Sequence, residues 1–206
     1  SWGKSLTDSI KQYKMWINTP GENSDTINTI FFDYEIAFGE TSIEETITEI
    51  IYKNAVGNKL FFDYLGNDAL KKPPPLGFFR QFLVEEGGEN KDTFDIKTRA
   101  LMPLIDAARL LTISHNIKGI NNTYMRFKQL AVADQKNAEL FVNCAEAFLT
   151  LSEFRTVEGL KNDTNGQFIN LEELSKTDKV KLKNCFIPIK ELQELIKNRF
   201  KLTYFS

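Results

Sequence analysis

Two carboxylates stand close together in the most strand-like stretch of the chain. Residues 30–39 are dense in aromatic and β-branched side chains, which favour β-strands. Strand alternation places Asp33 and Glu35 on one face, where their oxygens would suit a hard cation such as Mg²⁺. The alternative is the polar face of a half-exposed strand. A two-metal site would also need an Asp-x-Asp pair and a Gly-Ser turn, which the 206 residues lack, so both interpretations stay open.

Basic side chains form a second group of candidates, near the apolar faces of the later helices. Planar guanidinium groups suit a nucleotide or another phosphate, so this group would line an anion-binding groove. The alternative is a set of structural ion pairs and solvated helix faces, and spacing does not choose between the two. Asp106 and Arg109, three residues apart, can pair on one helix surface. The basic candidates are Lys97, Arg99, Arg109, Arg126 and Arg155, with Asp95, Asp106 and Glu158 as the local acids.

Gln193 interrupts an apolar seam near the end of the chain. A buried amide needs partners, because an unmade hydrogen bond costs about 1 to 3 kcal/mol. We therefore expect the Gln193 side chain to orient a neighbouring or bound group. The seam consists of Leu182, Phe186, Ile189, Gln193, Ile196 and Phe200, spaced alternately four and three residues apart.

The elements that position these residues fall into two parts, separated by the stiff run Pro73–Pro75. Before it, apolar periodicity predicts a helix over 6–16, the strand over 30–39, and two helices within 41–71. We place the domain boundary at the proline run, which gives units of residues 1–72 and 73–206.

The second part is predicted to be mainly helical. An extended excursion or β-hairpin comes first, with arms at 78–84 and 93–96 around a Gly-rich turn. Helices follow over 101–111, 123–130 and 135–160; the last carries two apolar stripes and is expected to be the central helix. The apolar seam predicts a final helix with a kink at Pro188. The expected fold is therefore mainly α, with a bundle of four to five helices in the second part.

Composition excludes several classes of protein. With 26 Lys and Arg against 28 Asp and Glu, the net charge of −2 argues against nucleic-acid and anionic-membrane binding. Cys144 and Cys185 cannot build a disulfide framework or a zinc knuckle, and His115, the only histidine, is expected at a helix end. We find neither a membrane-spanning apolar run nor a signal-peptide pattern, which fits a reducing cytoplasm. The chain opens at Ser1 directly into a helical pattern, so we expect a preceding segment.

Short motifs occur in an order that resembles one bacterial family, over nearly the whole chain. The segments that carry the resemblance are Trp2–Leu6, Trp16–Ile17, Phe32–Gly39, Pro74–Phe79, Asp95–Ala100, Pro103–Arg109, Thr123–Phe127, Glu146–Phe148 and Leu192–Gln193. The family is that of nucleotidyltransferases of signal-transduction proteins, similar to the uridylyltransferase that modifies the nitrogen-regulatory protein PII. The resemblance implies cyclic-nucleotide-binding and CBS sensor domains, then a polymerase-β-like catalytic domain, and then a helical substrate-binding domain.

The resemblance also implies roles for the candidate residues. Residues 1–72 would be the last part of the catalytic domain, an α/β palm fragment. Asp33 would be catalytic, as the third carboxylate of the palm and a ligand of Mg²⁺. The remaining motifs for triphosphate and metal would precede Ser1, so we expect these 206 residues alone to be inactive. The anion-facing groove would comprise Lys97, Arg99, Arg109, Arg126 and Arg155, with Asp106 and Gln193 orienting the substrate.

Two functions are carried forward. The first is transfer of NMP from an NTP to a protein or small-molecule acceptor, by in-line phosphoryl transfer under the control of sensor domains in the same chain. The second is a non-catalytic helical regulatory or docking module attached to a degenerate nucleotidyltransferase. Two departures from the family favour the second: Glu35 replaces an Arg, and Glu158–Gly159 replaces His-Gln, although Arg155 is retained. Neither function involves nucleic acid or a membrane, and a homodimer is left open.

Overall fold

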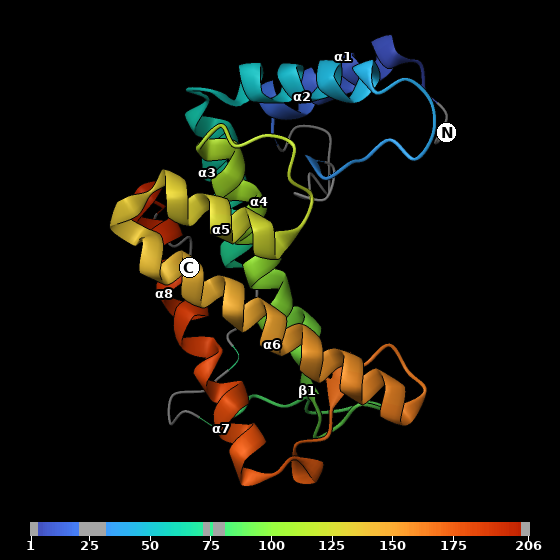
Figure 1. The fold of residues 1–206 in the computed structure, drawn as a ribbon, viewed down its shortest axis with the longest axis vertical. Coiled ribbons are helices and arrows are strands. Elements are labelled where there is room, and N and C mark those ends of the chain that lie inside the picture. Colours follow the sequence, from blue (N-terminus) through green and yellow to red (C-terminus); the bar gives the residue numbers. More distant parts are fainter. Residues whose placement is uncertain (1–3, 21–31, 72–74, 76–80, 203–206) are drawn as a thin grey trace.

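The computed structural model describes residues 4–20, 32–71, 75 and 81–202. In these ranges the chain is mainly α, as predicted, with one two-stranded sheet. Figure 1 shows α1 and α2 at one end of the molecule, the sheet and α7 at the other, and the remaining helices between them. The helices are α1 (Leu6–Asn18), α2 (Ser42–Ala55), α3 (Lys59–Leu70), α4 (Met102–Ser114), α5 (Thr123–Ala133), α6 (Ala138–Asn162), α7 (Lys176–Asn184) and α8 (Phe186–Arg199).

Side-chain hydrogen bonds cap α1 and α3 and join them to each other. The Ser5 side chain caps α1 by accepting a hydrogen bond from the backbone N–H of Asp8, and Asn58 caps α3 by accepting from that of Phe61. The Asn58 amide also donates to the carbonyl of Ile17 at 2.8 Å, which fixes the end of α1 on the start of α3. The predicted helices of this part are therefore confirmed.

The predicted strand over 30–39 is wrong for the residues that the structure describes. Residues 30 and 31 lie outside the description, and 32–39 form irregular chain and bends instead of a strand. Two half-buried aromatic side chains pack against helices instead: Phe32 packs edge-on to Phe61 of α3, and Tyr34 lies beside Tyr13 of α1, whereas Phe38 is fully exposed. Packing on helices thus covers aromatic surface that suggested a strand, and no partner strand is needed.

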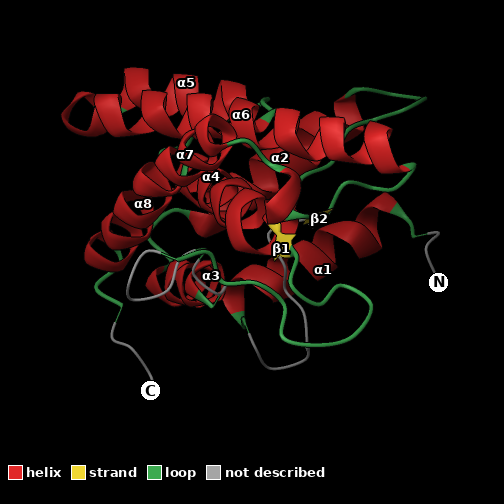
Figure 2. Ribbon diagram, turned by 90° about the horizontal axis from the view of Figure 1, so that it is seen from below, coloured by secondary structure: helices red, strands yellow, loops and turns green. Residues whose placement is uncertain are grey.

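The central helix is α4, and the expectation that the longer helix over 135–160 would be central is wrong. Side chains on nearly every face of α4 are buried, from Pro103 to Ile113. The longer helix α6 buries residues of both predicted stripes, Phe141 and Ala145 on one and Ala147 and Leu151 on the other, and leaves the rest of its surface less covered. Figure 2 shows α4 enclosed by α3, α5, α6 and α8. A short π-helix, Lys97–Leu101, leads into α4, and Pro103 occupies its first turn, where no backbone N–H is needed.

The hairpin prediction is only partly correct. Strand β1 (Phe94–Asp95) pairs antiparallel with β2 (Phe168–Ile169), a segment after α6, and not with the arm before the Gly-rich turn. Residues 78–80 of that arm lie outside the description. The turn itself is closed as expected, because Glu85 N donates to Thr93 O and Asp92 N donates to Glu85 O, both at 2.9 Å.

The last helix of the prediction is two helices, with Cys185 between α7 and α8. Pro188 lies in the first turn of α8, so it begins a helix instead of kinking one. Within α8 the buried seam runs through Leu192, at 1% exposure, and Gln193 is half-buried beside it. The expectation that Gln193 replaces a core residue is therefore wrong.

Two exclusions made from the sequence can be compared with the structure. Cys144 and Cys185 are both buried free thiols. Among the described helices, none has the length and apolar character needed to cross a bilayer.

Candidate functional site

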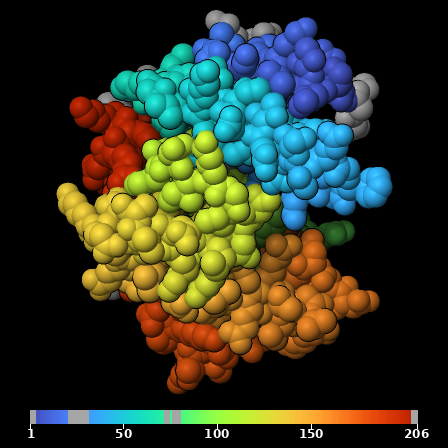
Figure 3. Space-filling model, turned by 45° about the horizontal axis from the view of Figure 1, so that its top comes forward, coloured from blue at the N-terminus to red at the C-terminus, as the bar shows by residue number. Residues whose placement is uncertain are grey.

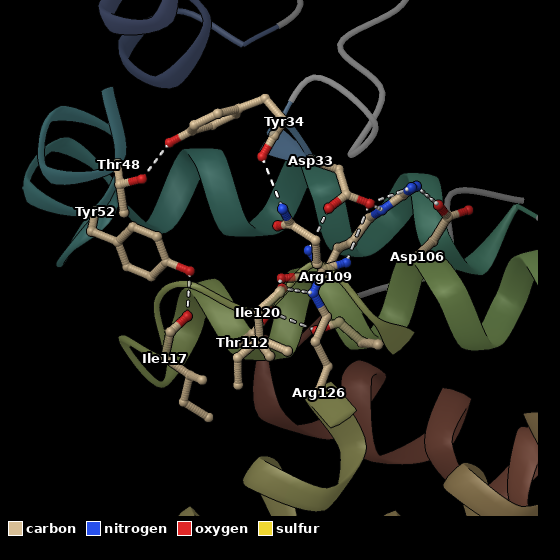
Figure 4. A network of polar contacts seen from close by, with 12 residues as sticks. Asp33, Tyr34, Thr48, Tyr52, Asp106, Arg109, Thr112, Ile117, Ile120 and Arg126 are labelled. Carbon is tan, nitrogen blue, oxygen red and sulfur yellow. Dashed lines mark hydrogen bonds and ion pairs between the residues drawn. The ribbon is translucent and has the colours of Figure 1, made fainter. Parts of the chain in front are cut away.

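Asp33 lies between two arginines from the central part of the bundle (Figure 4). Arg109 of α4 donates from Nε and Nη2 to one carboxylate oxygen of Asp33, at 2.9 and 2.7 Å. Arg126 of α5 donates from Nη2 to the other oxygen at 2.5 Å, and from Nη1 to the first at 3.4 Å. Both oxygens of Asp33 therefore accept charge-assisted hydrogen bonds, which are stronger than neutral ones.

Each arginine is positioned by its own surroundings. Arg126 donates from Nε to the carbonyl of Ile120 at 2.7 Å, just before the Asn122 side chain caps α5. Arg109 lies 3.6 Å from Asp106, one turn earlier on α4, which confirms that these two residues pair. Asp106 is only 1% exposed, so the pairing takes place inside the protein.

The segment that carries Asp33 is held by side chains in place of a β-ladder. Asn121 donates to the carbonyl of Tyr34 at 3.1 Å, and the N–H of Ile36 donates to Glu44 at 3.3 Å. The Tyr34 hydroxyl lies 2.7 Å from that of Thr48 on α2. These bonds satisfy backbone groups that a strand partner would otherwise satisfy.

The cluster brings two carboxyl groups together with two guanidinium groups. Asp33 pairs with Arg109 and Arg126, and Asp106 lies beside Arg109. Partial burial raises the pKa of Asp33, but hydrogen bonds from Arg126 and Arg109, with their positive charges, outweigh it and hold that pKa below its ordinary value. Burial also raises the pKa of the nearby Tyr52 to about 12, so its hydroxyl donates, as it does to the carbonyl of Ile117.

The arrangement around Asp33 does not fit a divalent cation. Mg²⁺ needs oxygen lone pairs, and both oxygens of Asp33 already accept N–H groups. Two guanidinium charges within hydrogen-bonding distance would also repel the ion. Within the described ranges, no group of three or more His, Cys, Asp or Glu side chains is arranged to hold a metal.

Comparison with known protein families places most of this chain in one of them. The family model described as "putative nucleotidyltransferase substrate binding domain" matches residues 59–200. The chain belongs to this family. Searches of curated proteins and of solved structures found no match.

The family domain contains Arg109 and Arg126 but not Asp33, which lies before residue 59. The Asp33 contacts therefore join a segment outside the matched range to two helices inside it. The match also includes α3, before the boundary that we place at residue 72, and α3 packs on α4 and α8. The position of that boundary stays a prediction.

The other basic candidates of the substrate-binding domain do not join this cluster. Arg99 donates to Glu85 from Nη2 at 3.1 Å, beside the turn that precedes β1. Lys97 lies half-buried in the same π-helix. Arg155 lies in the later half of α6, where its Nε donates to the carbonyl of Asn165 at 3.1 Å. The half-buried Gln193 is on α8. Of the residues predicted to line one groove, Asp106, Arg109 and Arg126 come together around Asp33, whereas Arg99 and Arg155 bind other partners.

The structure contains a further charged cluster that the sequence analysis did not predict. Arg199 at the end of α8 donates to Asp134 at 2.5 Å and to Nε2 of His115 at 2.7 Å. Nδ1 of His115 lies 2.8 Å from the carbonyl of Leu111, which can only accept, so Nδ1 carries the proton and Nε2 is free to accept. His115 ends α4, as expected, and Asp134 ends α5. The cluster thus joins the C-terminal ends of three helices, and the cap positions of His115 and Asp134 were the available signal.

Proposed function

We propose that this chain is the substrate-binding region of an enzyme that transfers NMP from an NTP to a protein or small-molecule acceptor. The family supports the coarse part of this proposal, a domain that binds substrate for a nucleotidyltransferase. The signalling role and the sensor domains in the same chain rest on the motif resemblance, and the cytoplasmic location rests on the composition of the chain. In the proposed enzyme, the helical domain binds and orients the substrate beside a catalytic domain to which residues 32–36 belong.

One observation carries the link between the two domains. Asp33, outside the matched range, is held by Arg109 and Arg126, which are inside it. A contact with two arginines fixes both the position and the orientation of the carboxylate. We therefore assign Asp33 a positioning role: it fixes the end of the catalytic domain on the substrate-binding domain.

This role replaces the metal-binding role expected of Asp33. Mg²⁺ would supply charge stabilisation to the transferred phosphoryl group in such an enzyme. We assign no Mg²⁺ ligand to the residues that the structure describes, since Asp33 is already bound by its two arginines. Asp33 would affect the rate by fixing the relative position of the two domains, because small displacements of bound reactants can cost about a hundredfold in rate.

The test is an NMP-transfer assay with labelled NTPs, on the protein that holds this chain together with its catalytic region. We expect Asp33→Asn to lower the transfer rate about tenfold or more by loosening the domains. Glu35→Gln, which removes the exposed acid two residues away, should leave it unchanged. The 206 residues alone should transfer nothing. An undiminished rate after Asp33→Asn would contradict the positioning role of Asp33. NMP transfer by the isolated chain would contradict the assignment of catalysis to a region outside these 206 residues.

A non-catalytic docking module is the second candidate. It is favoured by the contacts of Asp33, because both oxygens of that carboxylate are engaged by arginines. If every NTP and every condition gives no transfer in the full protein, with its fold intact, the docking module is the better description.

A further inference from the structure

A groove between the start of α4 and the later half of α6 combines an apolar floor with a single guanidinium group. Its volume is about 540 Å³, within the range of small-molecule sites. The end of the π-helix contributes Leu101, the start of α4 contributes Ile105, and α6 contributes Phe148. The other lining residues are Ser152, Arg155, Thr156, Gly159, Leu160, Asp163, Thr164 and Asn165.

The wall of the groove is fixed by two glycines. The N–H of Thr164 donates to the carbonyl of Gly159 at 3.0 Å, so the loop after α6 folds back on the helix. A Cβ on Gly166 would lie 1.8 Å from the carbonyl oxygen of Arg155, which shows how closely the loop approaches. The groove is therefore formed by well-positioned backbone before any ligand binds. The same contact gives Gly159, a departure from the family pattern, a structural role.

Arg155 differs from the other arginines that the structure describes. Arg99, Arg109, Arg126 and Arg199 each pair with a carboxylate. Arg155 has no carboxylate partner among the described residues. Its Nε donates to the carbonyl of Asn165, which holds the plane of the guanidinium group. A half-buried charge without a counterion has lost part of its hydration, so an anion that binds there restores favourable contacts.

Two hydroxyls add a complementary feature. Ser152 donates to the carbonyl of Phe148, and Thr156 donates to that of Ser152, both at 2.8 Å. Because their protons are used, their oxygens can only accept a hydrogen bond from a ligand. A ligand that fits all three features has an anionic group for Arg155, an apolar or planar body for the floor, and donors such as hydroxyl or amino groups.

We propose that this groove binds an organic phosphate of nucleotide size, with Arg155 holding the phosphate. The inference rests on the proposed function for the choice of a nucleotide, and on the groove for its position. Asp163 on the rim is the acid that faces the same space, and it disfavours highly charged ligands. A nucleoside monophosphate is therefore the fitting class, and not a triphosphate.

Isothermal titration calorimetry on the 206-residue chain tests this proposal, with AMP, GMP, CMP and UMP as probes. At least one should bind more tightly than both inorganic phosphate and its own nucleoside. Arg155→Gln should weaken that binding about tenfold or more, because it removes charge-assisted hydrogen bonds. Thr156→Trp should weaken it similarly by filling the groove while it leaves Arg155 in place. Lys190→Gln, the same charge change at an exposed position on α8, should have no effect.

Circular dichroism and unfolding midpoints confirm that each variant is folded. The proposal is overturned if no monophosphate binds, if inorganic phosphate binds as well as the nucleotides, or if either groove variant binds like the wild type. The assay needs no catalytic region, whereas the transfer assay on Asp33 variants does not depend on Arg155. Failure of one is therefore distinguishable from failure of the other.

Discussion

The surroundings of a charged side chain decide what chemistry it can do, and Asp33 and Arg155 illustrate the two outcomes. Asp33 is an acid whose two oxygens are occupied by arginines, so it acts as an anchor. Arg155 is a cationic side chain whose Nε donates to a backbone carbonyl, so its other two nitrogens can donate to a ligand. At this scale, the useful distinction is between charges with internal partners and charges without them.

Asp33→Asn should destabilise the protein by about 2 to 4 kcal/mol at pH 7, because it leaves two partly buried guanidinium groups without their shared carboxylate. The side chain is 17% exposed, and those of Arg109 and Arg126 are less so, which limits compensation by water. Urea unfolding followed by circular dichroism gives the difference in free energy. Glu35→Gln is the matched control, since Glu35 is exposed and only two residues away.

The loss of stability caused by Asp33→Asn should become smaller as the pH falls. The pKa of Asp33 is lower in the fold than in the unfolded chain, where it is about 3.9. Its stabilisation is therefore complete above the unfolded pKa and is lost as the pH falls through the lower, folded one. The difference between wild type and Asp33→Asn should shrink toward zero in that acid range, and a difference that persists there would contradict the role of the ion pairs.

The residue types at these sites could be predicted from sequence, but their pairing could not. Spacing along one helix was enough to pair Asp106 with Arg109. It could not pair Asp33 with Arg126, because that contact depends on how two distant segments pack. A groove lined by five basic residues was expected because nothing in the spacing places Arg99 and Arg155 away from Arg109.

Elements were predicted best where one helix face provides a regular apolar signal. The helices of the second part were found in this way, because periodicity and cap residues act locally. The strand over 30–39 failed because aromatic content does not reveal whether a partner strand exists, and here Phe32 and Tyr34 pack on helices. The split between α7 and α8 was missed because an apolar seam can continue through a break such as Cys185.

The loop after α6 allows a test of element packing. Gly166 has a φ of +65°, and an added Cβ would collide with the carbonyl of Arg155. Gly166→Ala should destabilise the protein by about 3 kcal/mol or more, from backbone strain together with displacement of the loop. Gly88→Ala is the control: its φ of +76° carries the same strain but nothing lies within 4 Å, so about 1 kcal/mol is expected.

Thermal or urea unfolding of the two variants measures both values. Equal losses would mean that only strain matters and that the loop does not pack closely on α6. A larger loss of stability for Gly166→Ala than for Gly88→Ala would support close packing of the loop on α6, which forms the wall of the groove.

At the scale of the whole molecule, the first three helices and the bundle share one core. Figure 3 shows the blue and cyan N-terminal part lying directly against the yellow-green middle of the chain. Inside, Phe62 of α3 stacks on Phe200 with ring centroids 5.6 Å apart, and Ile17 at the end of α1 is fully buried. These contacts cross the boundary predicted at residue 72, so a substantial apolar area would be exposed if the two parts separated.

This continuity predicts one cooperative unfolding transition for the chain. Its two tryptophans, Trp2 and Trp16, both lie in the N-terminal part, so their fluorescence reports on that part. Far-UV circular dichroism reports mainly on the longer helices of the bundle.

Because the shared core couples the two parts, urea transitions followed by the two probes should have coincident midpoints. Phe200→Ala should shift both midpoints downward together, since it removes the stacking partner of Phe62. If residues 1–72 and 73–206 were independent units, fluorescence and circular dichroism would instead show separate midpoints, and Phe200→Ala would move only the second.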